Sequence, residues 1–182
     1  MTNYETRIVT VFGSGRCADG LRDYQTAYDL GRLLAEAGFA VCNGGYGGTM
    51  EATARGAKYA GGPTIGIVAE IFGAEANKYI DRKIVVKTHH ERLLRLVYET
   101  DAYVVLPGGT GTLVELALVW EYVAKGLIAR KPIVVLGKAW ERVVDIMKHE
   151  LAKEGRTEAA GLVSAAGSTE ECVGLIQRGL RT

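Results

Sequence analysis

The sequence has few cysteines, almost no net charge and no long apolar run. Its three cysteines, at positions 17, 42 and 172, are odd in number and far apart, which excludes a disulfide framework and a cysteine metal site and favours a reducing compartment. The net charge of +1 gives no broad electrostatic surface for nucleic acid. No apolar run approaches the about 20 residues that span a bilayer, and residues 1–7 hold no apolar signal region. We therefore expect a cytoplasmic protein with neither nucleic acid nor membrane as a partner.

Glycine, by contrast, is abundant, with 24 residues that gather where short apolar runs end. These apolar runs alternate with segments of helical periodicity, the pattern of a parallel sheet covered on both faces. The length of 182 residues and the lack of a linker predict a single α/β domain over residues 1–182, with a sheet of about six or seven strands. The expected strands are residues 8–12, 40–42, 64–68, 83–87, 102–106, 132–136 and 162–164. The expected helices are residues 23–37, 49–59, 90–100 and 116–125, an amphipathic helix around 143–151 and a last helix opened by a capping box at Ser168 and Glu171.

Three glycine-rich turns follow predicted strands, after Phe12, Cys42 and Leu106. Ligands of parallel α/β sheets bind beyond the carboxyl ends of the strands, so the three turns are expected on one binding edge. The irregular stretch 69–81 could lie over such a pocket, and we expect Cys42 in the core.

The third turn, PGGTGTLVE at residues 107–115, carries the strongest chemical signal. Glycine lets a ligand approach the backbone closely, and the free amides at a helix start favour an anion such as phosphate. Glu115 puts a carboxylate beside that anion, which suggests chemistry or recognition of sugar hydroxyls; the plain alternative is a tight turn with an acid near a helix N-terminus. The expected phosphate and substrate contacts are Gly108, Gly109, Thr110, Gly111 and Thr112, with Gly13, Ser14, Gly45, Gly48 and Met50 as the remaining walls.

The absence of two sequence features narrows the type of nucleotide that the site could bind. Residues 13–18, GSGRCA, match the dinucleotide fingerprint, but Asn43 stands where an acidic residue would hold the ribose of NAD. No GxxxxGK[ST] loop is present for ATP. A mononucleotide fits better than a dinucleotide or a triphosphate, and no cofactor is implied.

A second group, THHER at residues 88–92, begins the helix before the central strand. Arg92 could face Glu115 across the pocket, or the group could be a solvated helix start. His89 and His90 are adjacent and diverge on a helix, so they cannot chelate one metal, and no metal is implied.

Together these residues resemble the LONELY GUY (LOG) family, whose members were often labelled lysine decarboxylase-like. Its motif PGGxGTxxE is matched in full by residues 107–115, its GGxxGxM element by residues 44–50, and part of its HERK element by residues 90–93. The resemblance covers about residues 9–136. It implies a Rossmann-like homodimer that hydrolyses the N-glycosidic bond of a nucleoside 5′-monophosphate, AMP or a cytokinin-like modified AMP, with Arg92 and Glu115 as catalytic residues.

The sequence also departs from that family. Leu93 replaces a lysine, Val114 a frequent acid and Tyr98 a frequent arginine. The turn 45–48 is similar to that of a related group that includes molybdenum-cofactor carriers, so a non-catalytic nucleotide or molybdenum-cofactor carrier is the alternative function. Lysine decarboxylation has the least support, because no lysine has the context of a pyridoxal-phosphate site.

The hypothesis for catalysis assigns Glu115 to the stabilisation of an oxocarbenium-like ribose. Arg92 either neutralises the leaving base or holds the phosphate. The helix 116–125 is apolar on more than one face, which favours a homodimer. In the alternative, Trp120 and Tyr122 pack under the C-terminal helices of the same chain.

Overall fold

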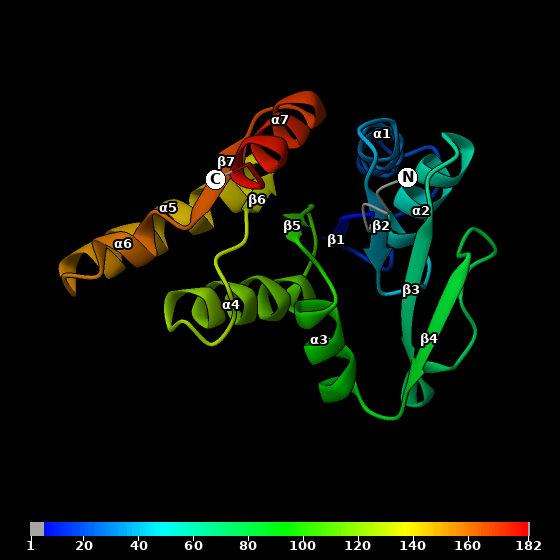
Figure 1. The fold of residues 1–182 in the computed structure, drawn as a ribbon, viewed down its shortest axis with the longest axis horizontal. Helices are drawn as coiled ribbons and strands as arrows, with labels where there is room; N and C mark the ends of the chain where they lie inside the picture. The colour runs from blue at the N-terminus through cyan, green and yellow to red at the C-terminus, as the bar shows by residue number, and fades with distance from the viewer. Residues whose placement is uncertain (1–5, 182) are drawn as a thin grey trace, which may run out of the picture.

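The computed structural model describes residues 6–181, which form an α/β fold around a seven-stranded parallel sheet (Figure 1). The strand order is β4-β3-β2-β1-β5-β6-β7, and every neighbouring pair is parallel. The predicted fold class is confirmed. The strands are β1 Ile8–Phe12, β2 Ala40–Asn43, β3 Thr64–Ala69, β4 Arg82–Val86, β5 Ala102–Val105, β6 Ile133–Leu136 and β7 Val163–Ala166.

The helices agree with the expected segments except at three places. They are α1 Arg22–Glu36, α2 Thr49–Tyr59, α3 His89–Tyr98, α4 Thr110–Ala124, α5 Lys138–Lys153, α6 Thr157–Ala160 and α7 Thr169–Gly179. The helix expected at 116–125 begins earlier, at Thr110, inside the glycine-rich turn. The short α6 was not predicted, and the stretch expected to be irregular contains a 3-10 turn, η1, at Glu70–Phe72. A single domain over 1–182 stays a prediction, because residues 1–5 and 182 lie outside the described part.

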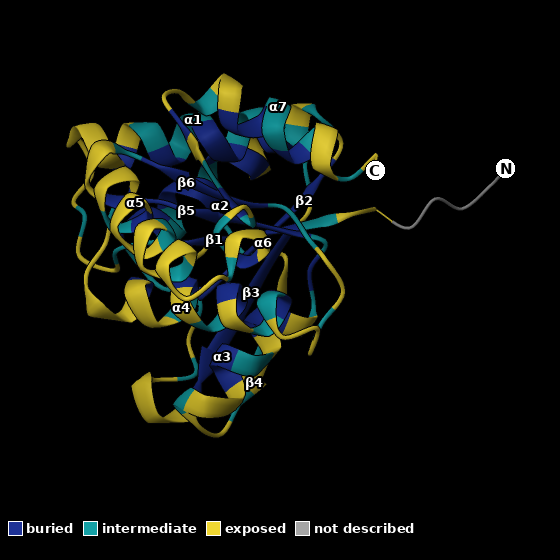
Figure 2. Ribbon diagram, turned by 90° about the vertical axis from the view of Figure 1, so that its left-hand side faces the viewer, coloured by how far each residue is buried: buried dark blue, intermediate teal, exposed yellow. Residues whose placement is uncertain are grey.

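Helices cover both faces of the sheet, so the inner strands are buried on both sides, whereas the edge strand β4 is largely exposed (Figure 2). On one face α1, α2 and α7 pack on side chains such as Val9 and Val104. On the other face α3, α4 and α5 pack on Tyr103 and Val135. This double burial explains why the strands read as continuous apolar runs rather than as alternating ones. Cys42 lies in the core as expected, and burial raises the pKa of its thiol to about 12.

The topology fixes where a ligand site can lie. The chain runs outward from β1 to β4, then returns to place β5 on the other side of β1, so the strand order switches between β1 and β5. Such a switch leaves a crevice at the carboxyl ends of the two strands. Here that crevice is bounded by the turn after Phe12 and the turn after Leu106. Within residues 6–181, no helix combines the length and apolar character needed to cross a membrane.

Candidate nucleotide site

The three glycine-rich turns meet at the carboxyl edge of the sheet, as predicted. The backbone amide and the hydroxyl of Thr49 both donate to the Ser14 carbonyl, at 2.9 and 3.1 Å. Gly48 has φ +70°, and a Cβ there would lie 2.2 Å from the Ser14 carbonyl oxygen. A Cβ on Gly108 would lie 3.2 Å from the Ser14 amide nitrogen. Glycine is therefore required where the turns touch, because their backbones are in direct contact.

The first turn of α4 opens into this edge without a side-chain cap. Its N-cap is Gly109, and no side chain among residues 6–181 accepts from the free amides of Thr110, Gly111 and Thr112. By contrast, Thr88 and Ser168 cap α3 and α7 through their hydroxyls. Thr110 and Gly111 are exposed while Thr112 is buried. The exposed start of α4 can thus accept an anion on backbone N–H groups.

Arg92, from α3, is held from several sides. Its Nε donates to the Ile67 carbonyl at 2.8 Å, its Nη2 lies 3.8 Å from Met50 Sδ, and its Cζ lies 5.4 Å from the centroid of the Tyr46 ring. Ile67 lies just past Gly66, the last residue of β3 that is paired with β2. Arg92 is only 6% exposed. Its remaining nitrogen, Nη1, points to Glu115.

Glu115 is a nearly buried carboxylate with one charged neighbour. Its side chain is 12% exposed, and Oε1 lies 3.9 Å from Arg92 Nη1. Burial raises the pKa of Glu115 to about 7, although Arg92 acts to lower it. Burial likewise lowers the pKa of Arg92, against the influence of Glu115. At 3.9 Å the two groups do not form a direct hydrogen bond, so both keep capacity for polar groups of a ligand.

The turn after β2 is shaped around Arg92. A Cβ on Gly44 would lie 1.6 Å from Arg92 Nη2, so the guanidinium occupies the space of a side chain. Asn43, found where a dinucleotide fold would place an acid, donates to the Met50 carbonyl at 2.9 Å and accepts from the Gly45 amide at 2.8 Å. Asn43 is fully buried and holds the turn, so its position is used for structure.

Tyr46 is the residue of this site that the sequence reasoning missed, since it was noted only as part of a turn. Its hydroxyl accepts from the Ala69 amide at 2.8 Å and lies 3.0 Å from the Gly73 carbonyl. Asn77 donates from its side chain to the Tyr46 carbonyl at 2.8 Å. The stretch 69–81, expected to lie over a pocket, is thus fastened to the Gly45–Tyr46 turn.

With the geometry in place, comparisons with known proteins identify the family. The model of the SLOG cluster4 family matches residues 6–172. This chain belongs to the SLOG cluster4 family. It is 34% identical to an uncharacterized protein of Archaeoglobus fulgidus, over 71% of this chain and 83% of that one. It is 35% identical to the cytokinin riboside 5′-monophosphate phosphoribohydrolase of Mycobacterium tuberculosis, over 53% of each chain. The match therefore spans about half the length of that enzyme.

Among solved structures, this SLOG cluster4 protein resembles the molybdenum cofactor carrier protein of Chlamydomonas reinhardtii. The TM-score is 0.77 at 25% identity, over 97% of this chain and 99% of that chain. The sequence resemblance to LOG proteins is confirmed, and so is the likeness to molybdenum-cofactor carriers. The chain is therefore similar in sequence to proteins named as hydrolases and similar in structure to a protein named as a carrier.

The start of α3 in this SLOG cluster4 protein serves structure as well as the site. The Thr88 hydroxyl caps the helix by accepting from the Glu91 amide at 3.1 Å, and the Glu91 carboxylate accepts from the amide of Lys87, the residue before the cap, at 2.8 Å. The ring of His89 packs edge-on against Phe72, with centroids 5.2 Å apart. Burial foremost lowers the pKa of His89, and the neighbouring charge of Arg92 lowers it further.

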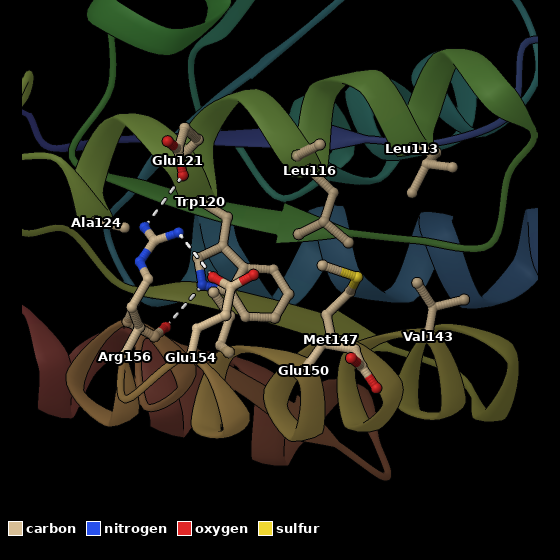
Figure 3. Close-up of a pocket in the computed structure, with 13 residues that line it drawn as sticks. Leu113, Leu116, Trp120, Glu121, Ala124, Val143, Met147, Glu150, Glu154 and Arg156 are labelled. Carbon is tan, nitrogen blue, oxygen red and sulfur yellow. Dashed lines mark hydrogen bonds and ion pairs between the residues drawn. The ribbon is translucent and has the colours of Figure 1, made fainter.

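An apolar groove of about 330 Å³ runs along the other side of α4, between α4 and α5 (Figure 3). Leu113 and Trp120 line it from α4, and Met147 lines it from α5. Glu115 follows Leu113 by two residues, which places it roughly 200° around the helix, so the groove and the Arg92–Glu115 pair lie on different sides. Trp120 donates to the Ala159 carbonyl at 2.8 Å and thus packs under α6, one of the C-terminal helices. Tyr122 contacts Tyr98 of α3 instead.

Proposed function

We propose that this protein hydrolyses the N-glycosidic bond of a nucleoside 5′-monophosphate, AMP or a modified AMP such as a cytokinin riboside monophosphate, to the free base and ribose 5-phosphate. The observation that carries the proposal is the nearly buried Glu115, 3.9 Å from Arg92 and one to two turns from the uncapped start of α4. A carboxylate in that position is costly for phosphate binding alone, because it repels an anion and must be desolvated. It is useful for a reaction that develops positive charge on a ribose.

The phosphate is assigned to the amides at the start of α4. Gly108, Gly109, Thr110 and Gly111 are all exposed there, next to the backbone of Ser14. The 5′-phosphate at this point directs the ribose toward Glu115, farther along α4. Arg92 Nε already donates to the Ile67 carbonyl, and its guanidinium lies over the Tyr46 ring. Arg92 is therefore assigned to Glu115 and the leaving base rather than to the phosphate.

In the reaction, the bond between C1′ and the base nitrogen breaks and its electron pair leaves with the base. The ionised Glu115 stabilises the oxocarbenium-like ribose that remains. Water adds to C1′ and gives its proton to Glu115, which can then pass a proton to the departing base. A pKa of about 7 suits this exchange near neutral pH. The Arg92 guanidinium offsets negative charge on the base without itself giving up a proton.

The test is a panel of purified nucleoside monophosphates, including AMP and prenylated AMP, incubated with the protein. Released base is measured by chromatography. We expect release from at least one purine monophosphate and none from the matching nucleoside, which lacks the phosphate. Binding of nucleotides without release of any base contradicts the proposal.

A carrier function is the second candidate, favoured by the likeness to the molybdenum cofactor carrier over nearly the whole of both chains. A carrier needs the phosphate turns but not the Arg92–Glu115 pair. Tight binding of a nucleotide-containing cofactor that Glu115→Gln leaves unchanged, without turnover, would favour it.

A homodimer is also part of this proposal, as is a cytoplasmic location. Leu113, which lines the groove, is 43% exposed, and Val114 next to it is 47% exposed, so the apolar surface of α4 continues past the groove. Covering them is the expected use of a second copy. Sedimentation that gives only the monomer mass at assay concentrations would contradict the dimer.

A further inference from the structure

The Tyr46 side chain contacts both the Arg92 guanidinium and the segment that follows β3. Its ring lies under the Arg92 guanidinium, 5.4 Å from Cζ to the ring centroid. Its hydroxyl reaches the segment after β3, where it accepts from the Ala69 amide and can donate to the Ala69 or the Gly73 carbonyl, at 3.1 and 3.0 Å. A hydroxyl has one proton, so it serves one of these carbonyls at a time.

The backbone of Tyr46 is fixed independently of its side chain. The backbone amide of Asn77 donates to the Gly45 carbonyl at 2.8 Å, and its side-chain Nδ2 donates to the Tyr46 carbonyl at 2.8 Å. The ring is therefore presented to Arg92 from a turn that is itself tied to residues 69–77.

The other contacts of Arg92 leave its guanidinium free to rotate, and the Tyr46 ring restricts this rotation. The bond from Nε to the Ile67 carbonyl fixes one atom, and the contact of Nη2 with a thioether sulfur is weak. The guanidinium plane could still turn about the Nε–H···O direction. The face of the Tyr46 ring restricts that rotation, because it lies against the guanidinium with Cζ 5.4 Å from the ring centroid. With the rotation restricted, Nη1 is directed at Glu115.

We propose that Tyr46 is a positioning residue: its ring holds the Arg92 guanidinium against Glu115, and its hydroxyl ties this pair to residues 69–73. The proposal rests on the proposed function only in treating Glu115 as the reacting group. Glu115 faces one charged group, Arg92 of α3. Arg92 in turn is influenced by Cys42 of β2 and Tyr46 of the turn, and its charge also acts on His89 of α3.

The experiment follows the ionisation of Glu115 directly, without substrate. The carboxyl carbon of Glu115 is titrated by ¹³C NMR and assigned with Glu115→Gln. Tyr46→Leu removes the ring, and Tyr46→Met is the second variant if the first does not fold. Tyr46→Phe keeps the ring and removes the hydroxyl. Tyr59→Leu, an exposed tyrosine of α2, is the control.

Because Arg92 acts to lower the pKa of Glu115, loss of its orientation should raise that pKa, by about one unit in Tyr46→Leu and Tyr46→Met. Tyr46→Phe should stay close to the wild type but speed hydrogen exchange of the Ala69 amide, which loses its acceptor. Tyr59→Leu should change neither measurement. An unchanged or lowered midpoint in the ring-removing variants overturns the proposal.

The outcome is separable from that of the nucleotide panel. If the midpoint rises as expected while no nucleotide is cleaved, the proposed hydrolysis fails and the positioning role of Tyr46 stands. If nucleotides are cleaved and the midpoint does not rise, the positioning role fails alone. In an active enzyme, Tyr46→Leu should lower kcat and leave KM unchanged, because the phosphate contacts at α4 are untouched.

Discussion

The two sides of α4 carry the same pair of side-chain types in opposite surroundings. On the inner side, Glu115 is 12% exposed and lies 3.9 Å from the buried Arg92. On the groove side, Glu121 is 51% exposed and lies 3.4 Å from Arg156 (Figure 3). Lys125 lies 3.9 Å from the same carboxylate. The outer pair is closer, yet its carboxylate remains in water. The inner carboxylate is nearly buried instead, and burial raises its pKa to about 7.

The difference shows that separation is a poor guide to the importance of an ion pair. An exposed pair contributes about 0–1 kcal/mol, since solvent screens it and ordering two long side chains offsets the gain. A buried pair costs desolvation that its attraction need not recover, so it adds little to stability. Burial of Glu115 is better explained by the proposed catalytic role than by a gain in stability. Glu121, on the same helix, is the matched residue for comparison.

The largest expected effect is on activity. Glu115→Gln keeps the shape of the side chain and removes its charge and its ability to accept a proton. We expect kcat for the best nucleotide of the panel to fall about 100-fold or more. Glu121→Gln, the same change on the same helix, should leave kcat within about twofold, as measured by released base. A Glu115→Gln enzyme that retains a third or more of the wild-type rate contradicts the catalytic role.

The second effect is a pH dependence of stability. The folded protein holds the Glu115 proton up to a pKa of about 7, whereas the unfolded chain releases it near the ordinary value of 4.5. The contribution of Glu115 to stability is therefore full below about pH 4.5 and is lost as the pH rises toward 7. The free energy of unfolding should fall by about 3 kcal/mol across this window through this group.

Urea unfolding at a series of pH values measures this effect as the difference between the wild type and Glu115→Gln. The subtraction removes the contributions of the other titrating groups. A difference that stays constant from pH 4.5 to 7.5 would show that Glu115 has an ordinary pKa and that the inner pair resembles the outer one.

The smallest effect concerns the stability of the outer pair. Glu121→Gln should change the free energy of unfolding at pH 7 by less than about 1 kcal/mol, and added salt should remove what change there is. The same urea experiment measures it. A loss of more than about 2 kcal/mol would mean that the outer pair is coupled to the packing of the groove, and the contrast between the two sides would fail.

The sheet could be predicted from sequence because buried parallel strands are continuous apolar runs. Residues 8–12 are a strand as predicted, and residues 64–68 are one to within a residue. The four-residue α6 and the three-residue η1 were missed, since elements of one turn show no periodicity. The start of α4 at Thr110 was also missed, because its first turn is made of glycine and threonine, which are weak helix formers.

The parts of the candidate site that lie at the carboxyl edge of the sheet could be predicted from the sequence. The contacts between segments far apart in the sequence could not. The sequence left open whether Arg92 faces Glu115 or belongs to a solvated helix start, and the structure brings the two side chains to 3.9 Å. No sequence pattern pointed to Tyr46. Its contacts join the turn after β2 to the end of β3, and only the folded chain shows that a tyrosine hydroxyl fits there.

Two glycines at the start of α4 leave unfilled space. A Cβ on Gly109 or Gly111 would meet no other atom within 4 Å, and Gly109 has a negative φ of −94° that other residues adopt readily. No contact within the described chain requires glycine at either position, and the open space leaves room for the close approach of the proposed phosphate to these amides. A ligand bound there, at 100 times its Kd, adds about 2.7 kcal/mol to the stability of the fold. The melting temperature of the unaltered protein thus becomes a detector for its physiological ligand in mixtures of metabolites, whether that ligand is cleaved or carried.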